Sequence, residues 1–107
     1  MQANAIVLRV RAEDAAEFER LFHEHEFPIW EDFKTRGILV SASLTRGELG
    51  THQTAGITNY VVTAVFHDMS GHTAHDSDPR FEAWNEMADR FQAEDPLVFG
   101  GTTLLAV

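Results

Sequence analysis

Strand-like and helix-like segments alternate along these 107 residues in an order that permits few folds. Residues 5–11, 38–45, 58–67 and 97–107 have the alternating or continuous apolar character of β-strands. Apolar residues at helical spacing fill the interval between the first two segments and the interval between the last two. The resulting order, β-α-β-β-α-β, is that of a split βαβ unit. We therefore expect an α+β fold with a four-stranded antiparallel sheet and both helices on one face.

The first helix is expected to begin at Asp14 and to end at Gly37. Asp14 stands three residues before Glu17, which is the spacing of a capping box, and glycine often follows the last residue of a helix. Because proline lacks a donor and clashes with the preceding turn, Pro28 predicts a kink or break near Phe27. The apolar stripe of this helix contains Ala15, Phe18, Phe22, Ile29 and Phe33.

The second helix is expected to begin at Asp78-Pro79, because aspartate caps helices and proline suits the first helical position. A polar segment, 68–77, precedes it. Gly100-Gly101 interrupts the final strand segment, and we predict a β-bulge there. The apolar stripe of the second helix contains Phe81, Trp84, Ala88 and Phe91.

Both faces of the third strand segment are apolar. Tyr60, Val62 and Phe66 would face one side, and Val61 and Val65 would face the other. An antiparallel sheet with one wet face should alternate between apolar and polar residues, and two helices cover only one face. An exposed second face would leave an apolar patch larger than monomers usually carry. We therefore predict a homodimer that packs sheet against sheet.

Charge and composition exclude several classes of function. The chain has 17 acidic and 8 basic residues and a net charge of −9, so neither nucleic acid nor an anionic membrane surface is an expected partner. It has no cysteine, which excludes disulfides, thiolate nucleophiles and cysteine-based metal sites. The N-terminal segment lacks the basic region of a signal peptide, so a cytoplasmic location is expected. The length suits one domain, which we place at residues 1–107.

The segment Ser70–Trp84 resembles the short helix, turn and long helix that follow the third strand in antibiotic-biosynthesis-monooxygenase-like proteins. His75 precedes the turn, and the aromatic residues Phe81 and Trp84 follow it. Together with the element order and the apolar sheet, this segment resembles the ferredoxin-like, dimeric α/β-barrel superfamily, which also includes NIPSNAP-like and EthD-like proteins. The resemblance implies a homodimer with a small-molecule pocket between the helices and the sheet of each subunit.

The superfamily includes cofactor-free oxygenases, haem-degrading enzymes, isomerases and proteins with no known chemistry. Its haem-degrading branch carries an asparagine on the first strand, a tryptophan before the second helix and a histidine within it. The strand segment 5–11 holds no asparagine, and His75 and Trp84 or Asn85 occupy the neighbourhood of the other two with the residue types changed. Haem degradation is therefore not expected, and we assign no cofactor.

Two histidines are candidates for a general base, because an unperturbed imidazole has a pKa near 6.5. His25 falls between Leu21 and Ile29 on the flank of the apolar stripe, so we expect its ring to point toward the sheet. The alternative for His25 is a structural ring bonded to a backbone carbonyl at the edge of the core. The resemblance places His75 in the lining of the pocket.

Five further residues are candidates for ligand binding. Glu26 lies on the other flank of the first helix, and the two tryptophans would line a pocket for a planar molecule, although a core or interface role is the alternative for both. Asn59 and Thr63 are small polar residues of the third strand segment that would orient a ligand between apolar walls. The five candidates are Glu26, Trp30, Asn59, Thr63 and Trp84.

The histidine-rich segment offers a metal site as an alternative. In a helix His72 and His75 share a face and, with Asp76, would suit zinc, nickel or ferrous iron. The pattern lacks the H-E-x-x-H arrangement, and Gly71 makes an exposed loop equally natural, so we assign no metal ligand.

Three functions stay open at this point. The first is a cofactor-independent enzyme, monooxygenase-like or isomerase-like, that uses a histidine base on an aromatic or polyketide-like molecule. The second is a non-catalytic dimeric module that binds a ligand or only assembles. The third is a metal- or haem-binding protein. The fold by itself does not separate them, because function resides in the site.

Overall fold

The computed structural model describes residues 1–107 and has the expected element order. The strands are β1 (Gln2–Arg11), β2 (Leu39–Arg46), β3 (Ile57–Phe66) and β4 (Leu97–Thr102). A 3₁₀ turn at Ala12–Asp14 precedes the helices α1 (Ala15–His25), α2 (Phe27–Thr35), α3 (Met69–Asp76) and α4 (Pro79–Asp89). The predicted α+β, ferredoxin-like fold is therefore confirmed. None of the helices has the length and apolar character needed to cross a membrane.

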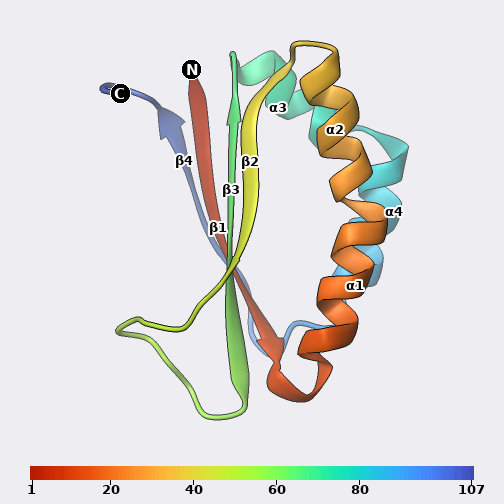
Figure 1. Ribbon diagram of the computed structural model, residues 1–107, viewed down its shortest axis with the longest axis vertical. Coiled ribbons are helices and arrows are strands. Elements are labelled where there is room, and N and C mark those ends of the chain that lie inside the picture. Colours follow the sequence, from red (N-terminus) through yellow and green to blue (C-terminus); the bar gives the residue numbers. More distant parts are fainter.

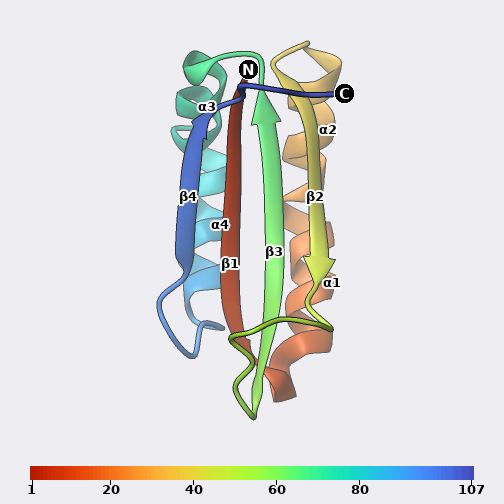
Figure 2. The same cartoon turned by 90° about the vertical axis from the view of Figure 1, so that its left-hand side faces the viewer.

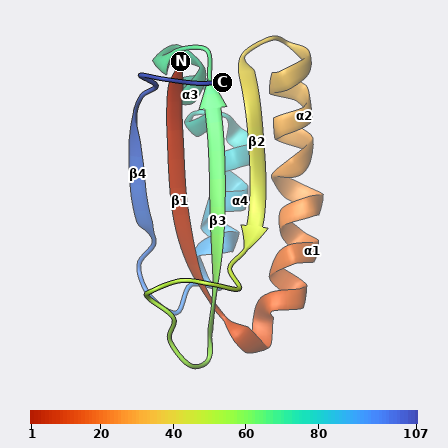
Figure 3. The same ribbon diagram turned by 60° about the vertical axis from the view of Figure 1, so that its left-hand side comes forward.

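The four strands form one antiparallel sheet in the order β2-β3-β1-β4. All four α-helices lie on one face of this sheet, and no helix or strand covers the other (Figure 1). Seen from the uncovered face, α1 and α2 lie behind β2 and β3, whereas α3 and α4 lie behind β1 and β4 (Figure 2). The intermediate view shows these two helical stretches running separately along the sheet (Figure 3).

The core lies between the helices and the sheet as one cluster of 12 buried apolar side chains. On the sheet side, Ile6 pairs with Val62 and Leu8 with Tyr60 across β1 and β3. Aromatic rings from the helices pack on these residues and on one another. The predicted stripe residues that are buried are Phe18, Phe22, Ile29, Phe33, Trp84 and Ala88.

The first helical segment breaks where proline predicts a break. α1 ends at His25 and α2 begins at Phe27, so Glu26 forms the junction and Pro28 lies in the first turn of α2. Gly37 follows the segment with a φ of 74°, a conformation that glycine adopts at low cost. Both local expectations are therefore confirmed.

Three other local expectations are wrong. The helix does begin at Asp14, which is the N-cap residue of α1, but the expected capping box is absent because Asp14 makes no side-chain capping hydrogen bond. β4 pairs with β1 in continuous register through Gly100-Gly101, without a bulge. Gly100 lies close to the side chain of Asn4 instead, since a Cβ at position 100 would be 2.8 Å from Oδ1 of Asn4. The first strand begins at Gln2 rather than at Ala5, so it does contain an asparagine.

The polar segment after β3 forms the short helix α3 rather than a loop. Asp68 caps it by accepting a hydrogen bond from the Ser70 backbone N–H at 2.9 Å. Gly71 faces the sheet, where a Cβ would lie 2.8 Å from Cγ2 of Ile38 and 3.2 Å from Cδ1 of Phe66. The absence of a side chain at this position therefore lets α3 pack directly on the end of the sheet.

Replacing Gly71 by alanine should lower the free energy of unfolding by about 1–3 kcal/mol, because the added methyl group overpacks this contact. Thr73→Ala is the matched control, since Thr73 is exposed on the same helix and its replacement should change stability by less than about 0.5 kcal/mol. Urea denaturation measures both variants. A Gly71→Ala protein as stable as the parent would show that the close packing of α3 is not required.

Candidate functional site

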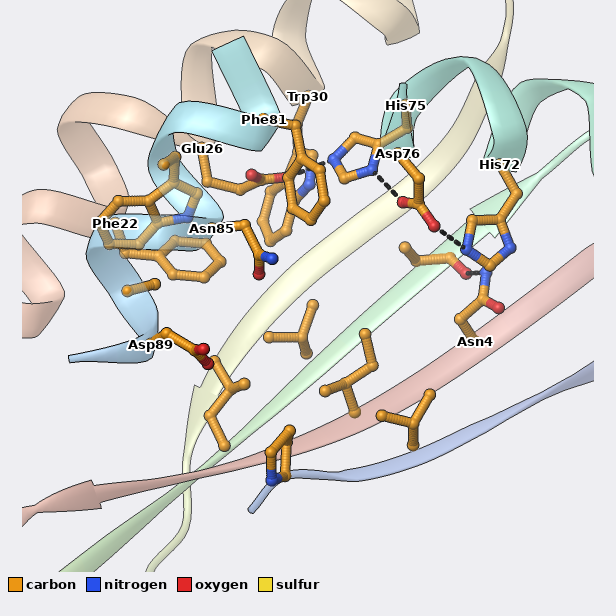
Figure 4. Close-up of a pocket in the computed structure, with 18 of the residues that line it drawn as sticks. Asn4, Phe22, Glu26, Trp30, His72, His75, Asp76, Phe81, Asn85 and Asp89 are labelled. Atoms are coloured by element: carbon orange, nitrogen blue, oxygen red, sulfur yellow. Dashed lines mark hydrogen bonds and ion pairs between the residues drawn. The ribbon is translucent and has the colours of Figure 1, made fainter. Parts of the chain in front are cut away.

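A pocket of about 250 Å³ lies between the helices and the sheet (Figure 4). All four helices contribute to its wall, and β1, β3 and β4 provide its floor. Asn85 and Asp89 of α4 and Val98 of β4 are exposed members of the lining, so the pocket opens between α4 and β4. The apolar lining includes Ile6, Leu8, Phe22, Trp30, Val62, Phe81 and Trp84.

Two carboxylates and two imidazoles lie in series along one side of the pocket, joined by two hydrogen bonds and one imidazole–carboxylate contact (Figure 4). Oε1 of Glu26 lies 2.6 Å from Nε2 of His75, and Nδ1 of His75 lies 2.9 Å from Oδ1 of Asp76. Oδ2 of Asp76 lies 3.0 Å from Nε2 of His72. The series thus runs from Glu26, which is 3% exposed, through His75 and the half-exposed Asp76 to His72.

Helix periodicity brings Glu26 into the pocket. It follows Phe22 by four residues and precedes Trp30 by four, so the three side chains share the inward face of the helical segment. The backbone continues the helical pattern across the junction, since Glu26 N–H donates to the Phe22 carbonyl and the Trp30 N–H donates to the Glu26 carbonyl. A carboxylate therefore interrupts an apolar stripe, and burial of that charge is tolerated only with a partner such as His75.

Two buried side-chain atoms in this series of residues, Oε2 of Glu26 and Nδ1 of His72, have no hydrogen-bond partner. Leaving a buried polar atom unsatisfied costs free energy, so native structures contain few such atoms. Both residues line the pocket. Oε2 of Glu26 is therefore an acceptor that an N–H or O–H group of a bound molecule can satisfy.

His75 binds a proton more tightly than an ordinary histidine. Burial lowers its pKa, but hydrogen bonds and charge interactions with Glu26, and then with Asp76, outweigh burial and raise the pKa above 6.5. Carboxylate oxygens face both ring nitrogens, an arrangement that favours the imidazolium because that form donates from both nitrogens. In this form His75 is an acid, and the free acceptor of the pair is Glu26.

The NMR titration of the His75 ring should have a midpoint above 6.5, and Glu26→Gln should lower that midpoint because the variant removes the main group that raises the pKa. Glu31→Gln is the matched control, since Glu31 is exposed on α2 and outside the pocket. An unchanged midpoint in Glu26→Gln would contradict the assigned pairing.

The same pKa shift predicts how stability depends on pH. A histidine whose pKa is raised by folding stabilises the folded state fully below its unfolded pKa, and this contribution is lost as the pH rises through the folded pKa. The free energy of unfolding should therefore fall across that range in the parent protein. His75→Gln should remove this part of the dependence in urea denaturation curves collected at several pH values. The same pH dependence of the free energy of unfolding in both proteins would contradict this role of His75.

Four of the seven residues proposed from the sequence line this pocket: Glu26, Trp30, His75 and Trp84. His25 lies outside it, half-buried, and stacks on Trp84 with ring centroids 5.5 Å apart and an interplanar angle of 13°. The expectation that its ring points to the sheet is wrong, because Glu26, one residue further along the helix, takes the inward position.

Asn59 and Thr63 also lie outside the pocket, on the uncovered face of the sheet. Alternation along β3 places Tyr60 in the core and therefore turns both residues away from the helices. Oδ1 of Asn59 accepts a hydrogen bond from Nη1 of Arg9 at 3.1 Å, and the hydroxyl of Thr63 lies 2.7 Å from that of Ser43.

Sequence reasoning does not identify several residues that line the pocket, or it predicts another role for them. The sequence pattern suggests His72 and Asp76 only as metal ligands, whereas here Asp76 is hydrogen-bonded to His75 and lies 3.0 Å from Nε2 of His72. No group of three or more histidine, aspartate or glutamate side chains is arranged to hold a metal ion. Asn85 and Asp89 follow Phe81 at steps of four residues, and this spacing is the signal that places all three on the pocket face of α4.

Asn4 is a further lining residue, and alternation with Ile6 is the signal for it. Its side-chain amide exchanges two hydrogen bonds of 2.7 Å with Gln2 and donates to the Ala64 carbonyl at 3.2 Å. The first strand therefore does contain an asparagine, contrary to the expectation from segment 5–11.

Comparison with known proteins identifies the fold. No protein-family profile and no curated protein sequence matches this chain. An antibiotic biosynthesis monooxygenase superimposes with a TM-score of 0.73 at 13% identity, over 98% of this chain and 100% of that one. A candidate antibiotic biosynthesis monooxygenase from Deinococcus radiodurans superimposes with a TM-score of 0.76 at 13% identity, over 100% of this chain and 96% of that one. HapK from Hahella chejuensis superimposes with a TM-score of 0.72 at 15% identity, over 100% of this chain and 96% of that one.

At these identities the likeness establishes a shared fold. The resemblance to antibiotic-biosynthesis-monooxygenase-like proteins is therefore confirmed at the level of architecture: this chain has the ferredoxin-like fold of those structures over nearly its whole length.

Proposed function

We propose that this protein is a cofactor-independent enzyme that moves a proton on a small, largely apolar molecule bound between its helices and its sheet. The observation that carries the proposal is the buried pair in which Oε1 of Glu26 lies 2.6 Å from Nε2 of His75 while Oε2 of Glu26 is unpartnered. A base and an acid held side by side in an apolar pocket are the elements of general acid–base catalysis. The pair replaces the lone histidine base expected from the sequence.

The proposed chemistry begins with proton transfer from an acidic C–H or O–H group of the bound molecule to Oε2 of Glu26. The electron pair stays on the molecule, and the nearby imidazolium of His75 stabilises the charge that develops there. Return of the proton to a different atom completes an isomerisation with no other reactant. The aromatic walls formed by Phe22, Trp30 and Trp84 suit a planar substrate whose anion is delocalised.

A monooxygenase-like outcome needs dioxygen as the second substrate. After proton removal, the carbanion of an activated CH₂ group reacts with dioxygen, and that carbon becomes a ketone. One oxygen atom enters the product, and the other leaves as water with the two hydrogens of the CH₂ group. The fold shared with antibiotic biosynthesis monooxygenases supports this form of the reaction.

Exchange of deuterium into aromatic and polyketide-like carbon acids, measured by NMR, tests proton removal independently of the later step. We expect Glu26→Gln and His75→Gln to slow exchange by about 10²-fold or more, because each variant removes one member of the acid–base pair. His25→Ala is the control, since it removes a histidine that stacks on Trp84 from outside the pocket, and it should retain the parent rate. Oxygen uptake with an anthrone as substrate tests the monooxygenase form.

Thermal unfolding of each variant shows whether a lost rate reflects lost folding. Equal exchange rates in the parent and in folded Glu26→Gln would contradict the proposed base. Absence of exchange with every carbon acid would favour the second interpretation, a ligand-binding module without catalysis.

We also propose that two copies associate through their uncovered sheet faces. One cross-strand row on this face is apolar over three strands, since Leu97 pairs with Val7 and Val7 pairs with Val61. In the next row Phe99 pairs with Ala5, and Ala5 pairs with Thr63. Phe99 is 61% exposed in the single chain. Burying such a face against a second copy removes apolar surface from water, which supports a homodimer.

Native mass spectrometry should give a mass near twice 12.0 kDa. Phe99→Asp should shift the protein to monomer, because the variant would bury a charge in the proposed interface. Met69→Asp is the matched control, since Met69 is 58% exposed but belongs to α3 on the helical side, and it should leave the dimer intact. A monomeric parent protein would exclude the sheet-to-sheet association.

A further inference from the structure

We infer that the ligand of this pocket carries no anionic group and directs an N–H or O–H donor at Oε2 of Glu26. The inference deepens the proposed function and rests on it for the choice of site. It concerns which molecules the pocket binds, whereas proton transfer is a step that occurs after binding.

The charged residues of the lining disfavour an anion. Glu26, Asp76 and Asp89 contribute three carboxylates, whereas no lysine or arginine lines the pocket. The only side chains there that can carry positive charge are His72 and His75. His75 is already paired with two carboxylates, and Nε2 of His72 lies 3.0 Å from Oδ2 of Asp76. Each imidazole therefore already lies next to a carboxylate, and Nδ1 of His72 is the only ring nitrogen of the two that has no partner.

The electrostatic field of the whole protein also disfavours an anionic ligand. Its net charge is −9, and a protein of that charge repels anions and attracts cations at distances up to about the Debye length. Asp89 is exposed at the opening of the pocket, between α4 and β4, where an incoming ligand passes. A neutral or cationic molecule therefore enters more readily than a carboxylate or a phosphate.

Oε2 of Glu26 supplies the specific contact. The residue is only 3% exposed, and this oxygen has no partner although Oε1 is bonded to His75. A ligand with a donor satisfies the oxygen by a charge-assisted hydrogen bond, whereas an apolar ligand of the same shape would cover the oxygen without satisfying it. The pocket should therefore discriminate strongly between two molecules that differ only by a donor.

The remaining walls set the shape of the ligand. Phe22, Phe81 and Trp84 present aromatic surface, and the volume of about 250 Å³ is below the range of roughly 300–1,000 Å³ that is usual for drug-sized ligands. A compact planar molecule fits these walls, with its donor at the buried end beside Glu26.

A series of naphthalenes tests this inference, because shape stays nearly constant while the substituent changes. The probes are 2-naphthol, 2-naphthylmethylammonium, 2-methylnaphthalene and 2-naphthoate. Trp30 and Trp84 are the two tryptophans of the chain and both line the pocket, so their indole N–H signals in NMR titrations report binding at this site. We expect the naphthol and the ammonium compound to bind about tenfold or more tightly than 2-methylnaphthalene, and 2-naphthoate to bind most weakly.

Substitution of Glu26 identifies the acceptor. Glu26→Gln should abolish the advantage of the ammonium probe and weaken the discrimination against 2-naphthoate, whereas Glu31→Gln, an exposed change of the same kind on α2, should alter neither. Glu26→Asp provides a second variant that keeps the charge but withdraws the carboxylate, and it should reduce the advantage of the naphthol.

Tightest binding of 2-naphthoate, or equal affinity for the four probes, would overturn the inference and leave proton transfer untouched. Failure of all four probes to shift the two indole signals would also overturn it. The expected order of affinities without any deuterium exchange would instead refute only the proposed enzymatic function.

Discussion

The hydrogen bond between Glu26 and His75 holds together parts of the chain that are 49 residues apart. Glu26 comes from the junction of α1 and α2, and His75 comes from α3, so the contact joins the two helical stretches on the same face of the sheet. Each side chain is almost fully buried, and an isolated charge in either position would be costly. Because each group makes burial of the other tolerable, the polar end of the pocket depends on this contact.

Backbone features bring the pair together. Pro28 interrupts the first helical segment at Glu26, yet the inward stripe continues across the junction from Phe22 to Trp30. On the opposite side, Gly71 has no side chain and lets α3 approach the sheet, where Phe66 packs near His75 with ring centroids 6.0 Å apart.

The two faces of the sheet have different uses. The helix-side face combines a packed aromatic core with a pocket that contains the Glu26–His75 pair. The uncovered face has an apolar row across β4, β1 and β3, formed by Leu97, Val7 and Val61, beside polar residues such as Asn59 and Thr63. Proteins with this fold share the layered architecture, whereas activity depends on the few polar side chains that enter the pocket. In this chain those side chains include the hydrogen-bonded Glu26 and His75, Oε2 of Glu26 has no partner, and no lysine or arginine is among them.

Much of the architecture is determined by local sequence. The apolar periodicities predict the element order, Pro28 predicts the helix break, and Gly37 predicts the end of the segment. These features are fixed within a few residues, because dihedral preferences and amphipathic spacing act over one or two turns. The observed ends of the strands lie within a few residues of the predicted ones, except at the last strand. The sequence predicts that this strand extends to residue 107, whereas β4 ends at Thr102.

The candidate site required the tertiary structure. Helical spacing identifies Glu26 as a charged residue within an apolar stripe. Only the packing of α3 places His75 beside it as a partner. Neighbouring residues of a helix differ by about 100° in direction, so a small error in the stripe exchanges Glu26 for His25. Likewise, alternation along β3 separates Asn59 and Thr63 from the core, but only the placement of the helices decides which face holds the pocket. Local preferences act along the chain, whereas the contacts between distant segments come from burying apolar surface and pairing buried charges in three dimensions.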